Sequence, residues 1–128
     1  MAEDVRAHAL LQETLLGEAL DNLDAGVFLA DEQGRYVAVN RFACTLTGYS
    51  REELLGMTVH AIAADASDYE PMLRGAKSEG VVGLRRKDGS IVLCEWRSGT
   101  TKIAGMTFYV GLNWPAAEPS EHGAPSAS

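Results

Sequence analysis

The 128-residue sequence has little of what secreted, membrane-spanning and disulfide-rich proteins carry. It contains two cysteines and four prolines, and no apolar run approaches the roughly 18 residues that a membrane-spanning helix needs. Its first residues, Met1-Ala2-Glu3-Asp4, are acidic where a secretion signal would be basic. We therefore expect a cytoplasmic protein that does not bind a membrane, with Cys44 and Cys94 as buried free thiols.

The sequence also lacks the residue patterns of common active sites. Its three histidines are far apart, at His8, His60 and His122. No spacing indicates a Ser-His-Asp or Cys-His pair, a metal-ligand cluster or a glycine-rich phosphate loop. We expect neither enzyme activity nor a metal site.

Positive charge is scarce as well, and the net charge of −7 is unevenly distributed. Residues 1–24 hold six acidic residues and one arginine, and the tail from Pro115 holds two more acids. Residues 25–114 carry ten acids and ten bases. Among the bases, only Arg85, Arg86 and Lys87 are consecutive in the sequence. Such a short basic cluster offers few phosphate contacts, so nucleic acid is not an expected partner.

The most informative stretch is residues 31–57. A polar turn that ends in Gly34 separates the apolar runs 27–30 and 36–39, and this pattern predicts a hairpin. Asn40 is placed to cap a following helix, and Gly48 to end that helix in the left-handed conformation. Ser50 and Glu53 have the spacing of a capping box for a second short helix.

Hydrophobic periodicity predicts the other elements. Residues 57–65 resemble a loop with Val59 and Ile62 turned inward. Val92, Cys94 and Trp96 alternate with Ile91, Leu93, Glu95 and Arg97, and the first set makes the cleaner buried face of the strand. Residues 100–105 should return the chain, and the Pro-rich tail should be disordered. The predicted elements are helices at 3–23 and 66–80, strands at 26–30, 36–39, 81–84, 91–98 and 106–113, and the tail at 115–128.

Several of these segments resemble a PAS domain, a sensory module found mostly in bacterial signalling proteins. They are Gly-Arg-Tyr-Val-Ala-Val-Asn at 34–40, Gly-Tyr-Ser at 48–50, Glu-Leu-Leu-Gly at 53–56, Arg-Arg-Lys-Asp-Gly-Ser at 85–90 and Tyr-Val-Gly at 109–111. The resemblance covers roughly residues 20–114. It implies an α+β fold, with a five-stranded antiparallel sheet, short helices on one face and an N-terminal helix packed outside. It divides the chain into a helix at 1–23, a PAS domain at 24–114 and a disordered tail at 115–128.

Two departures from the family pattern stand out. Phe42-Ala43 reverses the usual order of these two residue types, so the pocket wall should differ there. Asn113-Trp114-Pro115 replaces the usual Asp-Ile-Thr signature, and proline disfavours an immediate helical continuation. The N-terminal helix would then be the remaining rigid lever for passing on a signal.

The resemblance also implies a cavity between the sheet and the short helices, able to bind a small apolar ligand. An alternative is that the side chains predicted to line this cavity fill the core instead and leave no room for a ligand. The predicted ligand-pocket residues are Phe42, Leu46, Leu54, Val59, Ile62, Tyr69, Met72, Leu84, Cys94, Trp96 and Tyr109.

PAS domains host haem and flavins, so a redox, gas or light sensor is the alternative function. Haem is disfavoured because residues 66–80 contain no histidine to bind the iron. Cys44 lies in Arg-Phe-Ala-Cys-Thr rather than in the Asn-Cys-Arg motif of flavin adducts. Non-covalent flavin beside Trp96 or Tyr69 stays open, and no cofactor is required.

The N-terminal helix has a broad apolar stripe that contains the polar Gln12. It either covers its own sheet or pairs with its copy in a homodimer, and we favour the homodimer. The signal would then pass to a partner protein or a fused output domain. The predicted interface residues are Val5, Leu11, Leu15, Leu16, Leu20 and Leu23.

Overall fold

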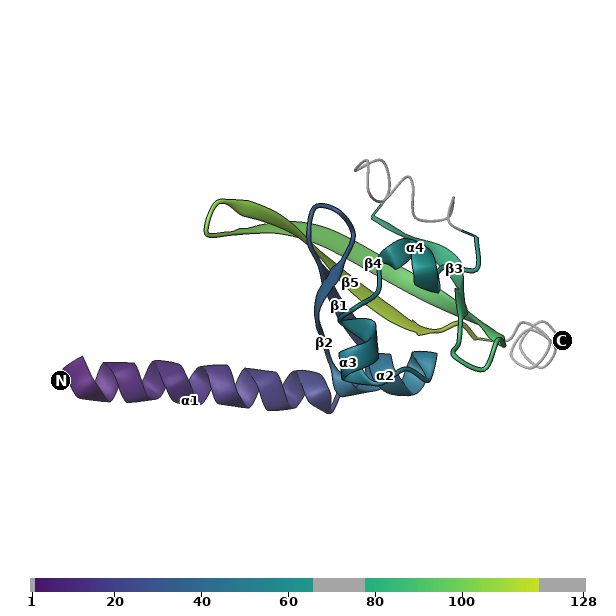
Figure 1. Cartoon of the computed structure of the whole chain (residues 1–128). Helices are drawn as coiled ribbons and strands as arrows, with labels where there is room; N and C mark the ends of the chain where they lie inside the picture. The colour runs from purple at the N-terminus through teal and green to yellow at the C-terminus, as the bar shows by residue number, and fades with distance from the viewer. Residues whose placement is uncertain (1, 66–77, 118–128) are drawn as a thin grey trace, which may run out of the picture.

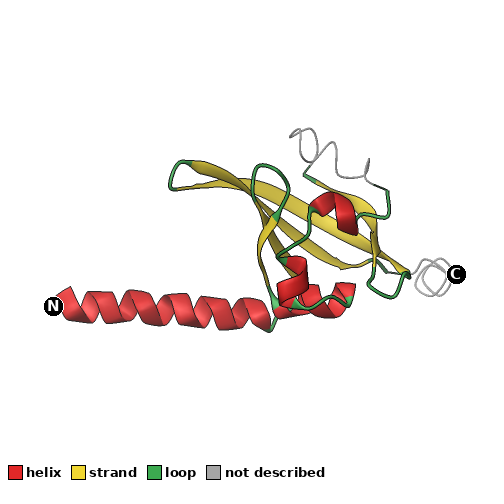
Figure 2. Ribbon diagram, in the orientation of Figure 1, coloured by secondary structure: helices red, strands yellow, loops and turns green. Residues whose placement is uncertain are grey.

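A computed structural model describes residues 2–65 and 78–117 of the chain, with the backbone alone for residues 2–10. It contains one antiparallel sheet with the strand order β2-β1-β5-β4-β3, and several short helices (Figures 1 and 2). The predicted α+β fold is confirmed. The strands are β1 Gly26–Ala30, β2 Tyr36–Val39, β3 Glu79–Arg85, β4 Ile91–Ile103 and β5 Met106–Pro115. The helices are α1 Ala2–Asp21, α2 Arg41–Thr47, α3 Arg51–Leu54 and α4 Val59–Ile62.

The turn and cap signals of residues 31–57 lie where the sequence predicts them. The Asn40 side chain accepts a hydrogen bond from the Ala43 N–H at the start of α2. Gly48 ends α2 with φ at 81°, a conformation that costs glycine little. Ser50 and Glu53 form both hydrogen bonds of a capping box at α3.

Some predicted boundaries differ from the structure. Residues 59–62 form the short helix α4 instead of a loop, because the Thr58 hydroxyl caps the Ala61 N–H. β4 continues through residues 99–103 instead of turning back at 100, because each of these residues pairs with β5. β5 includes Trp114 and Pro115, so it extends into the predicted tail, and β3 begins at Glu79 within the predicted helix. The rest of that helix up to residue 77, and the tail from residue 118, lie outside the described residues.

The hydrophobic core lies between the sheet and the short helices. The predicted alternation on β4 is confirmed at its clearest positions, since Cys94 and Trp96 are buried whereas Ile91 and Leu93 are exposed. Leu54 of α3 and Ile62 of α4 are fully buried from the helical side. Burial of each such side chain contributes roughly 1.5 to 3 kcal/mol.

Helix α1 projects away from the domain, and only its C-terminal end meets the sheet and α2 (Figure 1). Within residues 11–19 every residue is exposed, and Leu20 is half-buried. α1 therefore does not cover its own sheet along its length. The first of the two alternatives for this helix, that it only covers its own sheet, is not what the structure shows.

Candidate functional site

A small cavity of about 30 Å³ lies on the inner face of the sheet. Its size suits about one or two water-sized groups. Val59 of α4 closes it from the helical side, and the Phe28 and Tyr36 rings lie 5.2 Å apart in its wall. The lining residues are Phe28, Ala30, Tyr36, Val59, Trp96, Arg97, Ser98, Tyr109, Gly111 and Asn113.

The wall is built from alternate residues of paired strands. Tyr109, Gly111 and Asn113 follow each other at every second position of β5, so they share one face. Strand pairing places Asn113 opposite Trp96 of β4 and Gly111 opposite Phe28 of β1. With Tyr36 of β2, four strands therefore contribute to the wall.

Two polar side chains of this wall, Tyr36 and Asn113, are deeply buried. Burial raises the pKa of the Tyr36 phenol well above its ordinary value. The Asn113 side chain is 5% exposed, and its Oδ1 has no hydrogen-bond partner among the described residues. Most buried polar atoms in proteins have such a partner, so a buried oxygen without a hydrogen-bond donor is unusual.

The structure brings only part of the predicted pocket to this cavity. Val59, Trp96 and Tyr109 line it, whereas Phe42 packs half-buried against the core away from it. Tyr69 and Met72 lie outside the described residues. The other predicted residues are buried in the core without lining the cavity, namely Leu46, Leu54, Ile62, Leu84 and Cys94.

The sequence analysis missed the residues that β1 and β2 contribute, and Gly111 and Asn113 of β5, above all Tyr36 and Asn113. The period of two groups these residues by face but does not mark which face is buried, because Val27, Leu29 and Val110 make the other face at least as apolar. Residues 26, 28 and 30 alternate with more exposed neighbours on β1, and residues 109, 111 and 113 share a face on β5.

The cofactors hosted by PAS domains do not fit this cavity in the described conformation. A benzene-sized ligand occupies a cavity of about 150 Å³, and a flavin or haem ring system is larger still. The Cys44 thiol lies 3.7 Å from the Asn40 carbonyl oxygen and does not line the cavity. His60, on α4, is exposed. Cofactor binding stays a prediction, and we derive no chemistry from it.

A second, larger hollow of about 420 Å³ lies on the opposite face of the sheet, beside the end of α1. Gly17 and Leu20 of α1 line one side, and apolar residues of the sheet line the other. The sheet residues are Val27, Leu29, Ala38, Val39 and Val110. Leu11, Leu15 and Leu16 are 55%, 58% and 63% exposed farther along α1. Leu23 is 43% exposed, and the side chain of Val5 lies outside the description.

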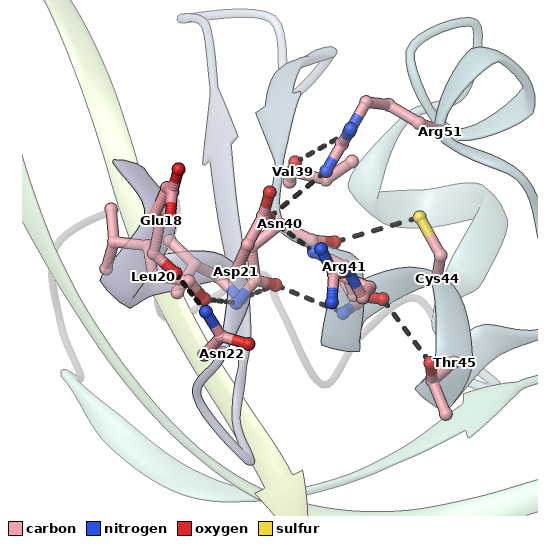
Figure 3. A network of polar contacts seen from close by, with 12 residues as sticks. Glu18, Leu20, Asp21, Asn22, Val39, Asn40, Arg41, Cys44, Thr45 and Arg51 are labelled. Atoms are coloured by element: carbon pink, nitrogen blue, oxygen red, sulfur yellow. Dashed lines mark hydrogen bonds and ion pairs between the residues drawn. The ribbon is translucent and has the colours of Figure 1, made fainter. Parts of the chain in front are cut away.

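A polar network joins the end of α1 to the domain, as Figure 3 shows. Asn40 Nδ2 donates to the Leu20 carbonyl oxygen, and the Arg41 N–H donates to Asp21 Oδ1 at 2.9 Å. Arg51 donates through Nη2 to Asp21 Oδ1 at 3.2 Å and through Nε to the Val39 carbonyl oxygen at 3.2 Å. α1 is thus attached to β2, α2 and α3 at a single point.

No group of three or more His, Cys, Asp or Glu side chains in the described part is placed to hold a metal ion. None of the described helices is long and apolar enough to span a membrane.

Comparison with known proteins identifies the family. A sequence model of the PAS fold matches residues 14–102. No curated protein matches the chain.

Solved structures agree with the family match. A PAS domain from a two-component sensor histidine kinase is 22% identical with a TM-score of 0.76, over 84% of this chain and 99% of that one. The PAS domain of an HTR-like protein from Haloarcula marismortui is 23% identical with a TM-score of 0.74, over 87% and 98%. An RNA-binding light-oxygen-voltage receptor is 20% identical with a TM-score of 0.73, over 89% of this chain and 36% of that one. The chain therefore belongs to the PAS family, whose domains are typical of sensory signalling proteins.

Proposed function

We propose that this PAS domain is a non-catalytic sensory and interaction module of a signalling protein, and that it signals through a dimer formed by α1. The core of the domain binds a small apolar ligand, or the domain binds no ligand and its dimer contacts a protein partner. A partner protein or a fused output domain then receives the change. The observation that carries the proposal is the exposed leucine face of α1.

The exposure of α1 argues for a partner. Most helical stability in proteins comes from packing of an apolar face against another element. Residues 11–19 of α1 are exposed throughout the described chain. Leu11 and Leu15 lie one turn apart on the same face, with Leu16 beside them. Burial of each leucine against a second copy would contribute roughly 1.5 to 3 kcal/mol.

The large hollow beside α1 extends this apolar surface onto the sheet. Leu20 lines the hollow from α1, and Val27, Leu29 and Val110 line it from the sheet. We assign the hollow to the α1 helix of the second copy, because Leu16 and Leu20 lie one turn apart and continue the exposed apolar surface of α1 into the hollow. Both would then lose their exposed apolar area in one interface.

A short route connects this interface with the cavity. Phe28 lines the cavity from β1, and the preceding N–H, of Val27, donates to Asn40 Oδ1 at 2.8 Å. Asn40 in turn holds the Leu20 carbonyl of α1. A ligand that favours one packing of the cavity can therefore shift the population of α1 orientations, provided that its affinity differs between them.

The double variant Leu11→Lys with Leu15→Lys tests the interface. We expect the unaltered chain to sediment as a dimer at micromolar concentration and the variant as a monomer with an unchanged far-UV spectrum of the domain. Thr14→Lys is the matched control, because residue 14 is exposed and lies outside the arc of the helix that the leucines of the proposed interface occupy. A monomeric unaltered chain, or a variant that still dimerises, would contradict the proposal.

A further inference from the structure

Asn113 is the polar side chain that the fold leaves without a partner in the cavity wall. It is 5% exposed, lines the cavity, and its Oδ1 accepts no hydrogen bond within the described residues. An acceptor that is buried without a donor destabilises the folded state, and an apolar residue of similar size would avoid this cost. The position therefore needs an explanation beyond packing.

The surroundings of Asn113 leave space for a group to approach it. Gly111 lies two residues earlier on the same face of β5 and also lines the cavity. A Cβ at Gly111 would lie 3.9 Å from Asn113 Nδ2 and 3.8 Å from the Phe28 carbonyl oxygen, which is ordinary contact. A methyl group would fit there without strain, so the glycine keeps open a space beside the amide.

The rest of the wall favours an uncharged and flat ligand. Phe28, Tyr36, Trp96 and Tyr109 supply aromatic surface. The single charged lining residue, Arg97, has a guanidinium 3.5 Å from Glu79, and both side chains are exposed outside the core. The raised pKa of Tyr36 reflects poor solvation of the wall. A charged ligand would lose its hydration here without gaining a counter-ion.

We propose that the cavity recognises a small, uncharged, flat molecule through one N–H or O–H group, which donates a hydrogen bond to Asn113 Oδ1. This inference rests on the proposed function, in which the cavity is the sensory site, and it adds the chemical class of the ligand. A cavity of about 30 Å³ admits the donor end alone. A ring must therefore move part of the wall, which is the population shift that a sensor requires.

Pyrrole and furan form a matched pair of probes, because the two rings have the same size and only pyrrole donates a hydrogen bond. Their affinities for the full chain would be measured by NMR titration, with the Asn113 side-chain amide resonances reporting the place of binding. We expect the preference for pyrrole over furan to fall about tenfold in Asn113→Leu. Because the preference for pyrrole over furan is compared between two proteins, the different hydration free energies of the two probes cancel. Leu112→Ala, on the other face of β5, should keep the preference of the unaltered chain.

Two further measurements keep the test decisive. Asn113→Leu should unfold at the same or a higher urea concentration, because it removes an unpaired buried acceptor. Gly111→Ala should fold normally and weaken both probes, because its methyl group fills the space beside the amide. An unfolded Asn113→Leu, an unchanged preference, or no binding of either probe to the unaltered chain would overturn the inference. The dimer is measured separately by sedimentation, so it stands or falls independently of these results.

Discussion

At the scale of single residues, the Asn40 side chain is notable because it makes four hydrogen bonds to separate parts of the described structure. Its Oδ1 accepts from the N–H groups of Val27 at 2.8 Å and Ala43 at 3.1 Å. Its Nδ2 donates to the carbonyl oxygens of Leu20 and, at 3.0 Å, Ala25. One side chain thus caps α2 and holds both β1 and the end of α1.

We predict that Asn40→Ala lowers the free energy of unfolding by roughly 2 to 4 kcal/mol, because a helix cap is lost and part-buried backbone groups lose their partners. Urea unfolding would measure the change. Asn22→Ala is the matched control, since Asn22 makes one exposed hydrogen bond to the Glu18 carbonyl oxygen. Its effect should stay within about 0.5 kcal/mol. Equal effects of the two variants would contradict the central role of Asn40.

The second prediction at this scale concerns Cys94 and alkaline pH. Burial raises the pKa of the Cys94 thiol from 9.0 to about 11, with Arg86 opposing the shift. The folded state therefore holds the proton more tightly than the unfolded state, and its stability is lost as the pH rises from 9 towards 11. We expect this thiol to remove about 1 kcal/mol of stability between about pH 8 and pH 10. In urea unfolding at both pH values, this pH-dependent loss of stability should disappear in Cys94→Ala and remain in Cys44→Ala.

At the scale of elements, the sequence predicted best where a chemical signal marks both ends. Asn40, Gly48 and Ser50 bound α2 and α3 with side chains or a backbone conformation that few residues supply. The prediction failed at β4, where Gly99 and the polar residues after it resemble a turn. Only their pairing with β5 holds them in a strand, and such pairing between distant residues is invisible to a local pattern.

The turn between β4 and β5 gives a prediction about an element. Two residues, Ala104 and Gly105, connect the strands, and both have positive φ, 53° and 81°. This conformation strains alanine but suits asparagine and glycine. We expect Ala104→Asn to raise the free energy of unfolding by roughly 0.5 to 1 kcal/mol, and Gly105→Ala to lower it by roughly 1 to 2 kcal/mol. Thermal unfolding would check both, and a destabilised Ala104→Asn would contradict the assigned turn.

The candidate site was less predictable than the elements. Trp96 and Val59 were found because each lies in a strongly apolar local pattern. Asn113 was not, because asparagine carries no signal of burial, and its place depends on the register of β5 against both β1 and β4. A cavity wall assembled from four strands requires the order of the strands in the sheet, which a single sequence leaves open.

At the scale of the whole molecule, the domain has one apolar interior and one exposed lever that meet at a small polar junction. Asp21 and Arg51 form the ion pair of this junction, at 3.2 Å and partly exposed. Exposed pairs contribute little to global stability. In the proposed function this pair orients α1, because a loosely attached helix would not transmit a shift of the core.

The last prediction separates orientation from stability. Arg51→Ala removes the contacts to Asp21 and to the Val39 carbonyl oxygen, so we expect faster amide hydrogen exchange at the C-terminal turn of α1. The unfolding midpoint in urea should change little, because the pair is exposed to solvent. Lys87→Ala is the matched control, since it removes another exposed pair that reaches α3, with Glu53 at 2.7 Å. That variant should leave exchange in α1 unchanged. If both variants accelerate exchange in α1 equally, or neither does, the ion pair does not hold the end of α1, which is then held by Asn40 and by the Arg41 N–H.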